Sequence, residues 1–114
     1  MNGAEAEDRA LQHLQRHGLQ ALARNWRCRG GELDLVLRDG TTLVIAEVRQ
    51  RSSAAYGGAL GSIDARKRER IVRATQLYLA EHPQHADAPL RFDVLALDGA
   101  GRIDWLKAAF DADD

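Results

Sequence analysis

The spacing of apolar residues near the N-terminus predicts an amphipathic helix over residues 4–17. Its apolar positions recur every three or four residues and are Ala6, Ala10, Leu11 and Leu14. Gly18 follows the helix, and glycine is frequent just beyond a helix end. The next stretch, 19–26, is short and mixed, and we expect it to be extended.

From residue 32 the pattern changes to the alternation that is typical of a β-strand. The alternating positions are Leu33, Leu35 and Leu37 on one side and Glu32, Asp34, Val36 and Arg38 on the other. Asp39-Gly40 is a strong hairpin signal, and residues 41–49 return as the second strand. One face of this second strand carries Leu43, Ile45, Glu47 and Arg49.

The second half of the chain predicts another helix and two more strands. Residues 52–61 are rich in Ser, Ala and Gly and predict a loop, and a helix follows over 64–82. The buried positions of this helix are expected to be Ile71, Val72, Thr75, Tyr78 and Leu79. After a proline-bracketed connector, strands are predicted over 90–97 and 102–106, with a fraying acidic end. This order predicts one α/β domain over residues 1–114, with a mixed central sheet flanked by helices.

Composition narrows the class of protein. The chain has 114 residues, of which 45% are hydrophobic and 29% charged, which excludes disordered and collagen-like chains. The longest apolar run, 43–46, is far short of the roughly 20 residues that span a membrane. No signal-peptide pattern is visible, and the single cysteine, Cys28, excludes an internal disulfide. We therefore expect a cytoplasmic protein that does not insert into membranes.

Charge is distributed unevenly despite a net charge of -1. Residues 49–73 contain seven basic and two acidic side chains, a surplus of five positive charges. This segment favours an anionic partner such as nucleic acid, and Arg51, Lys67 and Arg70 are the candidate phosphate contacts. The alternative is a solvated helix face without a partner.

Four charged residues interrupt the apolar hairpin: Glu32, Asp34, Glu47 and Arg49. A turn centred on Asp39-Gly40 would place Glu32 opposite Glu47, whereas a longer loop would place Asp34 there. Either pairing brings two carboxylates within reach of one ion. Such neighbours repel unless a proton or a cation lies between them, and carboxylate oxygens suit Mg²⁺ or Mn²⁺.

Arg49 lies two residues after Glu47 and therefore on the same strand face. In phosphodiester hydrolysis a cation beside the metal ligands stabilises the extra negative charge of the transition state. The alternative is a structural ion pair of Arg49 with Glu32 or Asp34 at a sheet edge. Asp93, within the apolar strand 90–97, is expected to pair with an arginine rather than with a metal.

Residues 31–36 (GELDLV) and 43–49 (LVIAEVR), followed by Arg51-Ser52-Ser53 and Gly57, resemble the YraN family of small bacterial proteins. Further matches extend over nearly the whole chain and are Glu7, Ala10, 25–27, Lys67, Ala74, 78–79, 91–94 and 109–110. The resemblance implies a restriction-endonuclease-like fold of the PD-(D/E)xK superfamily, similar to archaeal Holliday-junction resolvases.

The resemblance also implies roles for individual residues. Asp34 corresponds to the aspartate of the motif, Glu47 to its second acidic residue, and Glu7 to a glutamate that resolvase-like members add from the first helix. Arg49 stands where the motif has lysine, and Glu32 matches the family without a defined role. Arginine keeps the charge but presents a larger planar group that does not release a proton.

Three hypotheses follow for the function. The first is a Mg²⁺- or Mn²⁺-dependent endonuclease or resolvase-like enzyme that acts on structured DNA, with a homodimer expected by analogy with resolvases. The second is a non-catalytic nucleic-acid-binding relative with a degenerate site. The third is a protein-interaction domain that reuses the fold. The acidic pair favours the first hypothesis, Arg49 favours the second, and the sequence pI near 6.4 leaves the third open.

Overall fold

The computed structural model describes residues 1–51 and 63–113 and has two layers of helix around one sheet. The helices are α1 (Gly3–Arg16), α3 (Ala65–Glu81) and the short 3-10 helix η1 (Pro83–His85). The strands are β1 (Gln20–Cys28), β2 (Gly31–Asp39), β3 (Thr42–Gln50), β4 (Leu90–Leu97) and β5 (Ile103–Phe110). They form a sheet in the order β1-β2-β3-β4-β5, in which β3 and β4 are parallel and the other neighbours antiparallel.

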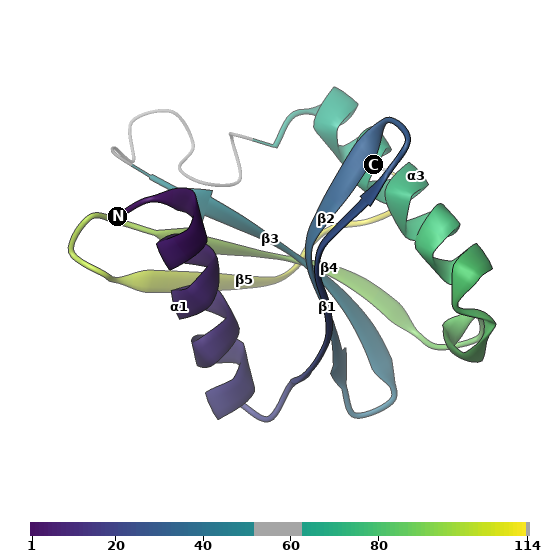
Figure 1. Cartoon of the computed structure of the whole chain (residues 1–114), viewed down its shortest axis with the longest axis horizontal. Helices are drawn as coiled ribbons and strands as arrows, with labels where there is room; N and C mark the ends of the chain where they lie inside the picture. The colour runs from purple at the N-terminus through teal and green to yellow at the C-terminus, as the bar shows by residue number, and fades with distance from the viewer. Residues whose placement is uncertain (52–62, 114) are drawn as a thin grey trace.

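The two helices pack on opposite faces of this sheet (Figure 1). The core on the α1 side includes Ala6, Ala10, Leu14, Leu35, Leu37, Val44 and Leu95. The core on the α3 side includes Leu43, Ile45, Ile71, Ala74, Tyr78, Phe92 and Phe110. The expected mixed central sheet flanked by helices is confirmed. Within the described ranges, no helix is both long and apolar enough to cross a membrane.

Both predicted helices are confirmed, and capping side chains explain where they begin. The Oδ1 of Asn2 accepts a hydrogen bond from the Glu5 N–H at 2.9 Å, and the Oδ1 of Asp64 accepts one from the Lys67 N–H at 2.9 Å. Each cap satisfies a backbone donor that the first helical turn leaves free. Gly18 follows α1 with a φ of +89°, a conformation that favours glycine.

The ends of the sheet differ from expectation. The stretch predicted over 19–26 continues as β1 to Cys28, and the final strand reaches Phe110, so its predicted end at residue 106 is wrong. Phe110 is buried and stacks on Phe92 at 4.9 Å between ring centroids, which extends the pairing of β5 with β4. The loop predicted over 52–61 lies outside the described residues.

Asp93 is a structural residue, as expected. It is fully buried and accepts hydrogen bonds from Arg91 Nε at 3.1 Å, from Trp105 Nε1 at 2.9 Å and from the Ala108 N–H at 3.0 Å. Arg91 also donates to Asp39 at 2.9 Å. These bonds satisfy a buried carboxylate and join β4 to β5 and to the end of β2.

Candidate functional site

The hairpin of β2 and β3 places Asp34 opposite Glu47. Asp39 pairs with Thr42, so the turn is centred on Gly40-Thr41, one residue later than the Asp39-Gly40 signal indicates. Gly40 has a φ of +60°, which explains glycine at this position. The pairing continues to Leu35 and Ala46, and the next step brings the two carboxylates face to face. The sequence left two pairings open, and this is the one expected for a longer loop, with Asp34 rather than Glu32 opposite Glu47.

The backbone pairing of β2 with β3 changes at this step. The Asp34 N–H donates to Glu47 Oε2 at 3.2 Å, and the Val48 N–H donates to Asp34 Oδ2 at 2.9 Å. At this step, carboxylate oxygens rather than backbone carbonyl oxygens of the neighbouring strand accept the backbone hydrogen bonds. The two carboxylates therefore lie between β2 and β3. On the facing strand β1, Asn25 has a φ of +50°, which is unusual for a residue other than glycine.

This irregularity also breaks the alternation predicted for the leucines of β2. Leu35 and Leu37 pack on the α1 side as one face, but Leu33 belongs to the core on the α3 side. The expectation that all three leucines share one face is therefore wrong. The strand changes the face that it presents at Asp34, which lies between the two groups and borders a cavity on each side.

Burial makes two adjacent negative charges unfavourable in this site. Glu47 is 2% exposed, and its burial, together with the Asp34 carboxylate, raises the pKa of Glu47 to about 8. Burial also raises the pKa of Asp34, although the Val48 N–H and Arg49 oppose that shift. A proton or a cation is therefore needed to stabilise the pair at neutral pH.

Arg49 supplies part of the compensating charge. Its Nη2 lies 3.6 Å from Glu47 Oε1 and its Nη1 lies 4.0 Å from Asp34 Oδ2, while Nη1 donates to the Val48 carbonyl at 3.1 Å. Nη2 is buried without a hydrogen-bond partner among the described residues. The ion pair with Asp34, which the sequence offered as the alternative to a catalytic role, exists, but it lies between interior strands rather than at a sheet edge. Glu32 pairs instead with Arg27, at 3.4 Å.

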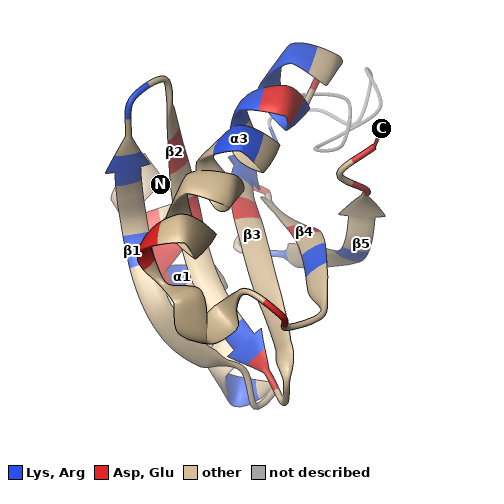
Figure 2. Cartoon of the chain, turned by 90° about the vertical axis from the view of Figure 1, so that its right-hand side faces the viewer, with Lys and Arg blue, Asp and Glu red and all other residues tan. Residues whose placement is uncertain are grey.

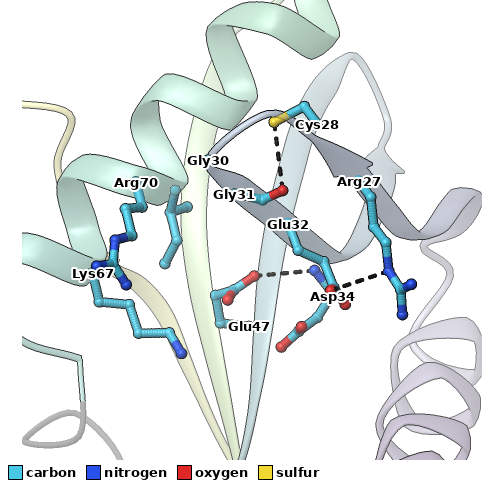
Figure 3. A pocket seen from close by; sticks show the side chains of 10 residues that line it. Arg27, Cys28, Gly30, Gly31, Glu32, Asp34, Glu47, Lys67 and Arg70 are labelled. Atoms are coloured by element: carbon cyan, nitrogen blue, oxygen red, sulfur yellow. Dashed lines mark hydrogen bonds and ion pairs between the residues drawn. The ribbon is translucent and has the colours of Figure 1, made fainter.

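Two cavities meet at Asp34. The larger, 420 Å³, is lined by both carboxylates and by Glu32, Arg27, Lys67 and Arg70 (Figure 3). The smaller, 230 Å³, is lined by Glu7, Asp34, Arg49 and Gln50. The acidic pair therefore separates a space bordered by α3 from a space bordered by α1.

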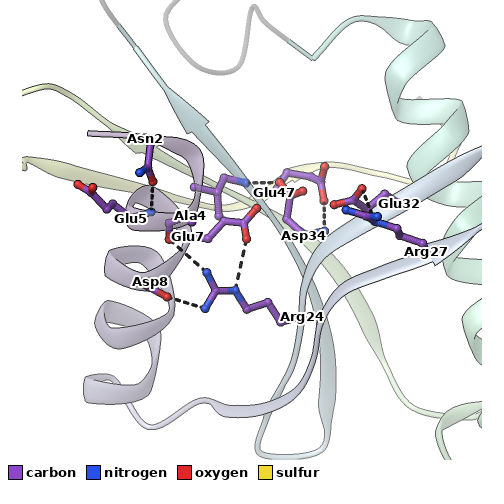
Figure 4. Close-up of polar contacts among 11 residues, drawn as sticks. Asn2, Ala4, Glu5, Glu7, Asp8, Arg24, Arg27, Glu32, Asp34 and Glu47 are labelled. Carbon is purple, nitrogen blue, oxygen red and sulfur yellow. Dashed lines mark hydrogen bonds and ion pairs between the residues drawn. The ribbon is translucent and has the colours of Figure 1, made fainter.

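Glu7 reaches the neighbourhood of Asp34, as the family pattern implies, but it has partners of its own. Its Oε1 accepts from Arg24 Nε at 3.3 Å, and Arg24 also pairs with Asp8 at 2.5 Å (Figure 4). The Glu7 charge contributes to the raised pKa of Asp34. In the part of the chain that the structure describes, no three Asp, Glu, His or Cys side chains are arranged to hold a metal ion.

A close approach of α3 to β2 places basic residues beside the acidic pair. A Cβ atom on Gly31 would lie 3.3 Å from the Arg70 carbonyl oxygen and 3.4 Å from Ala74 Cβ, so glycine allows this contact. The basic first turns of α3 consequently lie beside the acidic positions of β2 and β3 (Figure 2).

Of the three candidate phosphate contacts, the structure brings two to the site. Lys67 and Arg70 line the larger cavity with the carboxylates, but Arg51 pairs with Asp104 and lines a separate hollow near Leu97. An adjoining cavity of 390 Å³ is lined by Gly30, Arg66, Glu69, Arg70 and Arg73. Sequence reasoning missed Arg27 and this extension, because both depend on how β1 and α3 pack.

The raised pKa of Glu47 predicts a pH-dependent stability. In an unfolded chain this carboxyl ionises near its ordinary value of 4.5, but in the fold it does so near 8, so the fold binds the proton more tightly. Its stabilising contribution is full below 4.5 and is lost as the pH rises toward 8, at a rate of up to about 1.4 kcal/mol per pH unit. Glu47→Gln is therefore expected to unfold at higher urea than wild type at pH 8 in metal-free buffer, and at similar urea at pH 4.5.

The exposed Glu81 provides the matched control, since Glu81→Gln removes the same charge from the end of α3. Its urea midpoint should follow that of wild type at both pH values. Equal midpoints for wild type and Glu47→Gln at pH 8 would show that the pKa of Glu47 is not raised in the fold.

The fold and the site together define an α/β protein in which a buried carboxylate pair opens into a groove with a basic wall. The family model described as "Uncharacterised protein family UPF0102" matches residues 6–97. The chain therefore belongs to UPF0102, which is the YraN family. A UPF0102 protein of Pseudomonas entomophila is 56% identical over 113 residues, covering 96% of this chain and 92% of the relative. Another, from Pseudomonas fluorescens, is 52% identical over 115 residues, covering 97% and 94%.

Proposed function

We propose that this protein is a divalent-metal-dependent nuclease of the restriction-endonuclease-like class, which hydrolyses phosphodiester bonds in DNA. The observation that carries the proposal is the pairing of Asp34 with Glu47 inside the sheet, open to a cavity whose other wall carries Lys67 and Arg70. An acidic pair alone would repel a nucleic acid. An acidic pair faced by two cations provides places for both a metal ion and the phosphate.

The donor set fits Mg²⁺ or Mn²⁺. Both ions accept one or two carboxylates and complete their coordination with water and substrate phosphate, so Asp34 and Glu47 suffice as protein ligands. When bound, the ion supplies an activated water and neutralises charge on the phosphate. Arg49, which already faces both carboxylates, keeps them oriented and offsets their repulsion.

Hydrolysis is balanced without a further reactant. A water oxygen bonds to phosphorus, one P–O ester bond breaks, and its electron pair goes to the departing sugar oxygen. One proton of the water ends on that oxygen, and the other stays on the new phosphomonoester or passes to solvent. The role of the chain is to orient the phosphate and to stabilise the charge that develops on its oxygens.

Structured DNA in the cytoplasm is the substrate class that we propose. The acidic pair lines the larger cavity, and Arg70 lines both this cavity and the adjoining one along α3, so a strand can pass Arg70 and continue beside Arg66 and Arg73. A homodimer would present two such grooves to the two symmetric strands of a branched substrate.

The direct test combines metal binding and cleavage in one buffer. Mn²⁺ binding to the wild-type chain is measured by isothermal titration calorimetry, and cleavage is measured on four-way-junction, flap and single-stranded DNA. Metal binding with cleavage of any of these substrates is expected. A chain that binds no Mn²⁺ and cleaves none of them would contradict the proposal.

A second candidate is a nucleic-acid-binding protein without catalysis. The observation that favours it is the Arg49 guanidinium, which lies 3.6 Å from Glu47 and 4.0 Å from Asp34 and so occupies part of the space where a cation would act. This candidate predicts DNA binding that does not depend on divalent metal, together with no cleavage. DNA binding measured with and without Mn²⁺, beside the same cleavage assay, therefore separates the two candidates.

The salt dependence of DNA affinity should come mainly from the basic residues that line the cavities along α3. Each phosphate contact contributes about one unit to the slope of log affinity against log salt concentration. Arg70→Gln is expected to reduce that slope by about one unit, because Arg70 borders both cavities along α3. Arg51→Gln should reduce it less, because Asp104 already neutralises Arg51.

Fluorescence anisotropy at several salt concentrations measures the slope. Arg16→Gln, at the end of α1, removes the same charge outside these cavities and should leave the slope unchanged. An unchanged slope for Arg70→Gln would remove Arg70 from the interface.

A further inference from the structure

Among the described residues, two cations of the site have side chains without a hydrogen bond or ion pair: Arg70, which is exposed, and the less exposed Lys67. Lys67 is half-buried, lines the larger cavity and extends toward Glu47 (Figure 3). Its charge lowers the pKa of Glu47, against the larger effect of burial. An ammonium group held near an acidic pair without a hydrogen bond is available to a ligand.

Arg49, the residue at the lysine position of the motif, already has partners within the protein. It faces both carboxylates and donates to the Val48 carbonyl, and it lines the smaller cavity on the α1 side. Lys67 and Arg49 therefore lie on different sides of Asp34. A phosphate that enters the larger cavity meets Lys67 and Arg70 rather than Arg49.

The backbone of Lys67 is fixed, although its side chain is free. Its N–H donates to the capping Asp64, and the turn that follows packs through Ile71, which is 2% exposed. Gly31 sets the distance between α3 and β2. The fixed backbone therefore keeps the ammonium group in one part of the cavity, while the flexible four-carbon side chain lets it adjust to a ligand.

We propose that Lys67 is the catalytic cation of this site, with its ammonium group contacting a non-bridging oxygen of the scissile phosphodiester. The inference rests on the proposed nuclease function. As the water oxygen bonds to phosphorus and the ester bond breaks, negative charge grows on the non-bridging oxygens, and a compact ammonium group stabilises it. The cation that the motif places on a strand is here supplied by helix α3, so arginine at position 49 is compatible with catalysis.

The kinetic test compares the only two lysines of the chain, Lys67 and Lys107. Lys67→Met is expected to lower the single-turnover cleavage rate by about 10²-fold, since one transition-state contact is lost. Its affinity for an uncleaved phosphorothioate oligonucleotide should change far less. Lys67→Arg should recover part of the rate, and Lys107→Met, which removes the same charge beside Trp105 on β5, should cleave like wild type.

A second measurement does not depend on cleavage. Reductive methylation with ¹³C-formaldehyde keeps the lysine charges and gives lysine signals from Lys67 and Lys107 alone. Adding the phosphorothioate oligonucleotide with Mg²⁺ is expected to shift the Lys67 signal and to leave the Lys107 signal in place. Lys67→Gln identifies the signal and provides a second variant for the kinetics.

The outcomes separate this inference from the proposed function. If wild type cleaves DNA and Lys67→Met and Lys67→Gln cleave equally well, the Lys67 assignment is overturned and the nuclease proposal stands. A Lys67 signal that does not respond to the oligonucleotide also overturns the assignment. If wild type cleaves none of the DNA substrates and binds no metal, both are overturned.

Discussion

Replacing Asp34 with asparagine is expected to reduce Mn²⁺-dependent DNA cleavage by about 10³-fold, because the variant loses a ligand charge at the reacting centre. The Val48 N–H donates to Asp34 Oδ2 at 2.9 Å, and an asparagine Oδ1 can accept the same bond. The fold should therefore persist, so the loss is chemical rather than structural. Affinity for Mn²⁺ should fall by more than about tenfold. Loss of a residue that only supports a metal ligand already lowers affinity by about tenfold or more, and Asp34 is proposed as a ligand itself.

The measurement is single-turnover cleavage together with calorimetric titration of Mn²⁺. Asp87→Asn, an exposed aspartate after η1, removes the same charge outside the site and should match wild type in both assays. Glu47→Gln should behave as Asp34→Asn does. Unchanged Mn²⁺ affinity in both site variants would show that the pair does not bind the ion.

Arg49→Lys is the second large change that we expect, in the opposite direction. The guanidinium of Arg49 lies against both carboxylates, and its Nη2 is buried without a hydrogen bond among the described residues. Lysine keeps the charge in a smaller group, which leaves more of the carboxylate surface to a metal ion. The cleavage rate is expected to rise by about 10²-fold, equivalent to about 3 kcal/mol of transition-state stabilisation.

Arg38→Lys, an exposed arginine of β2 that bonds to Gln20, is the matched control and should cleave like wild type. A slower Arg49→Lys variant would show that the site has adapted to the guanidinium. Absence of cleavage by both wild type and Arg49→Lys, with DNA binding retained, would favour the non-catalytic candidate.

Local pattern predicted much of the acidic half of the site. Asp34 and Glu47 belong to one hairpin, so strand alternation and a glycine turn were enough to predict that they share a face. The register depended on a shift of one residue in the turn, from Asp39-Gly40 to Gly40-Thr41, which sequence signals do not resolve. The change of face at Leu33 could not be predicted, because carboxylates replace backbone partners only in the assembled sheet.

The basic half of the site depends on contacts between distant segments. In the sequence, Lys67 and Arg51 are equally good candidates for a phosphate contact. The packing of α3 on β2 brings Lys67 into the cavity of the acidic pair, whereas Arg51 pairs with Asp104. The length of β5 depends likewise on Phe110 stacking on Phe92. Periodicity describes one segment at a time, and these features arise between segments.

Gly31 has a consequence for how related sequences are compared. Even a methyl group there would crowd the Arg70 carbonyl oxygen and Ala74 Cβ, and a larger side chain must displace α3 from β2. A relative could then retain every charged residue of the site while its lysine and its carboxylates no longer line one cavity. Alignments that score only the acidic and basic positions would count such a protein as intact, so residue 31 belongs among the positions to compare before the proposed function is extended to a relative.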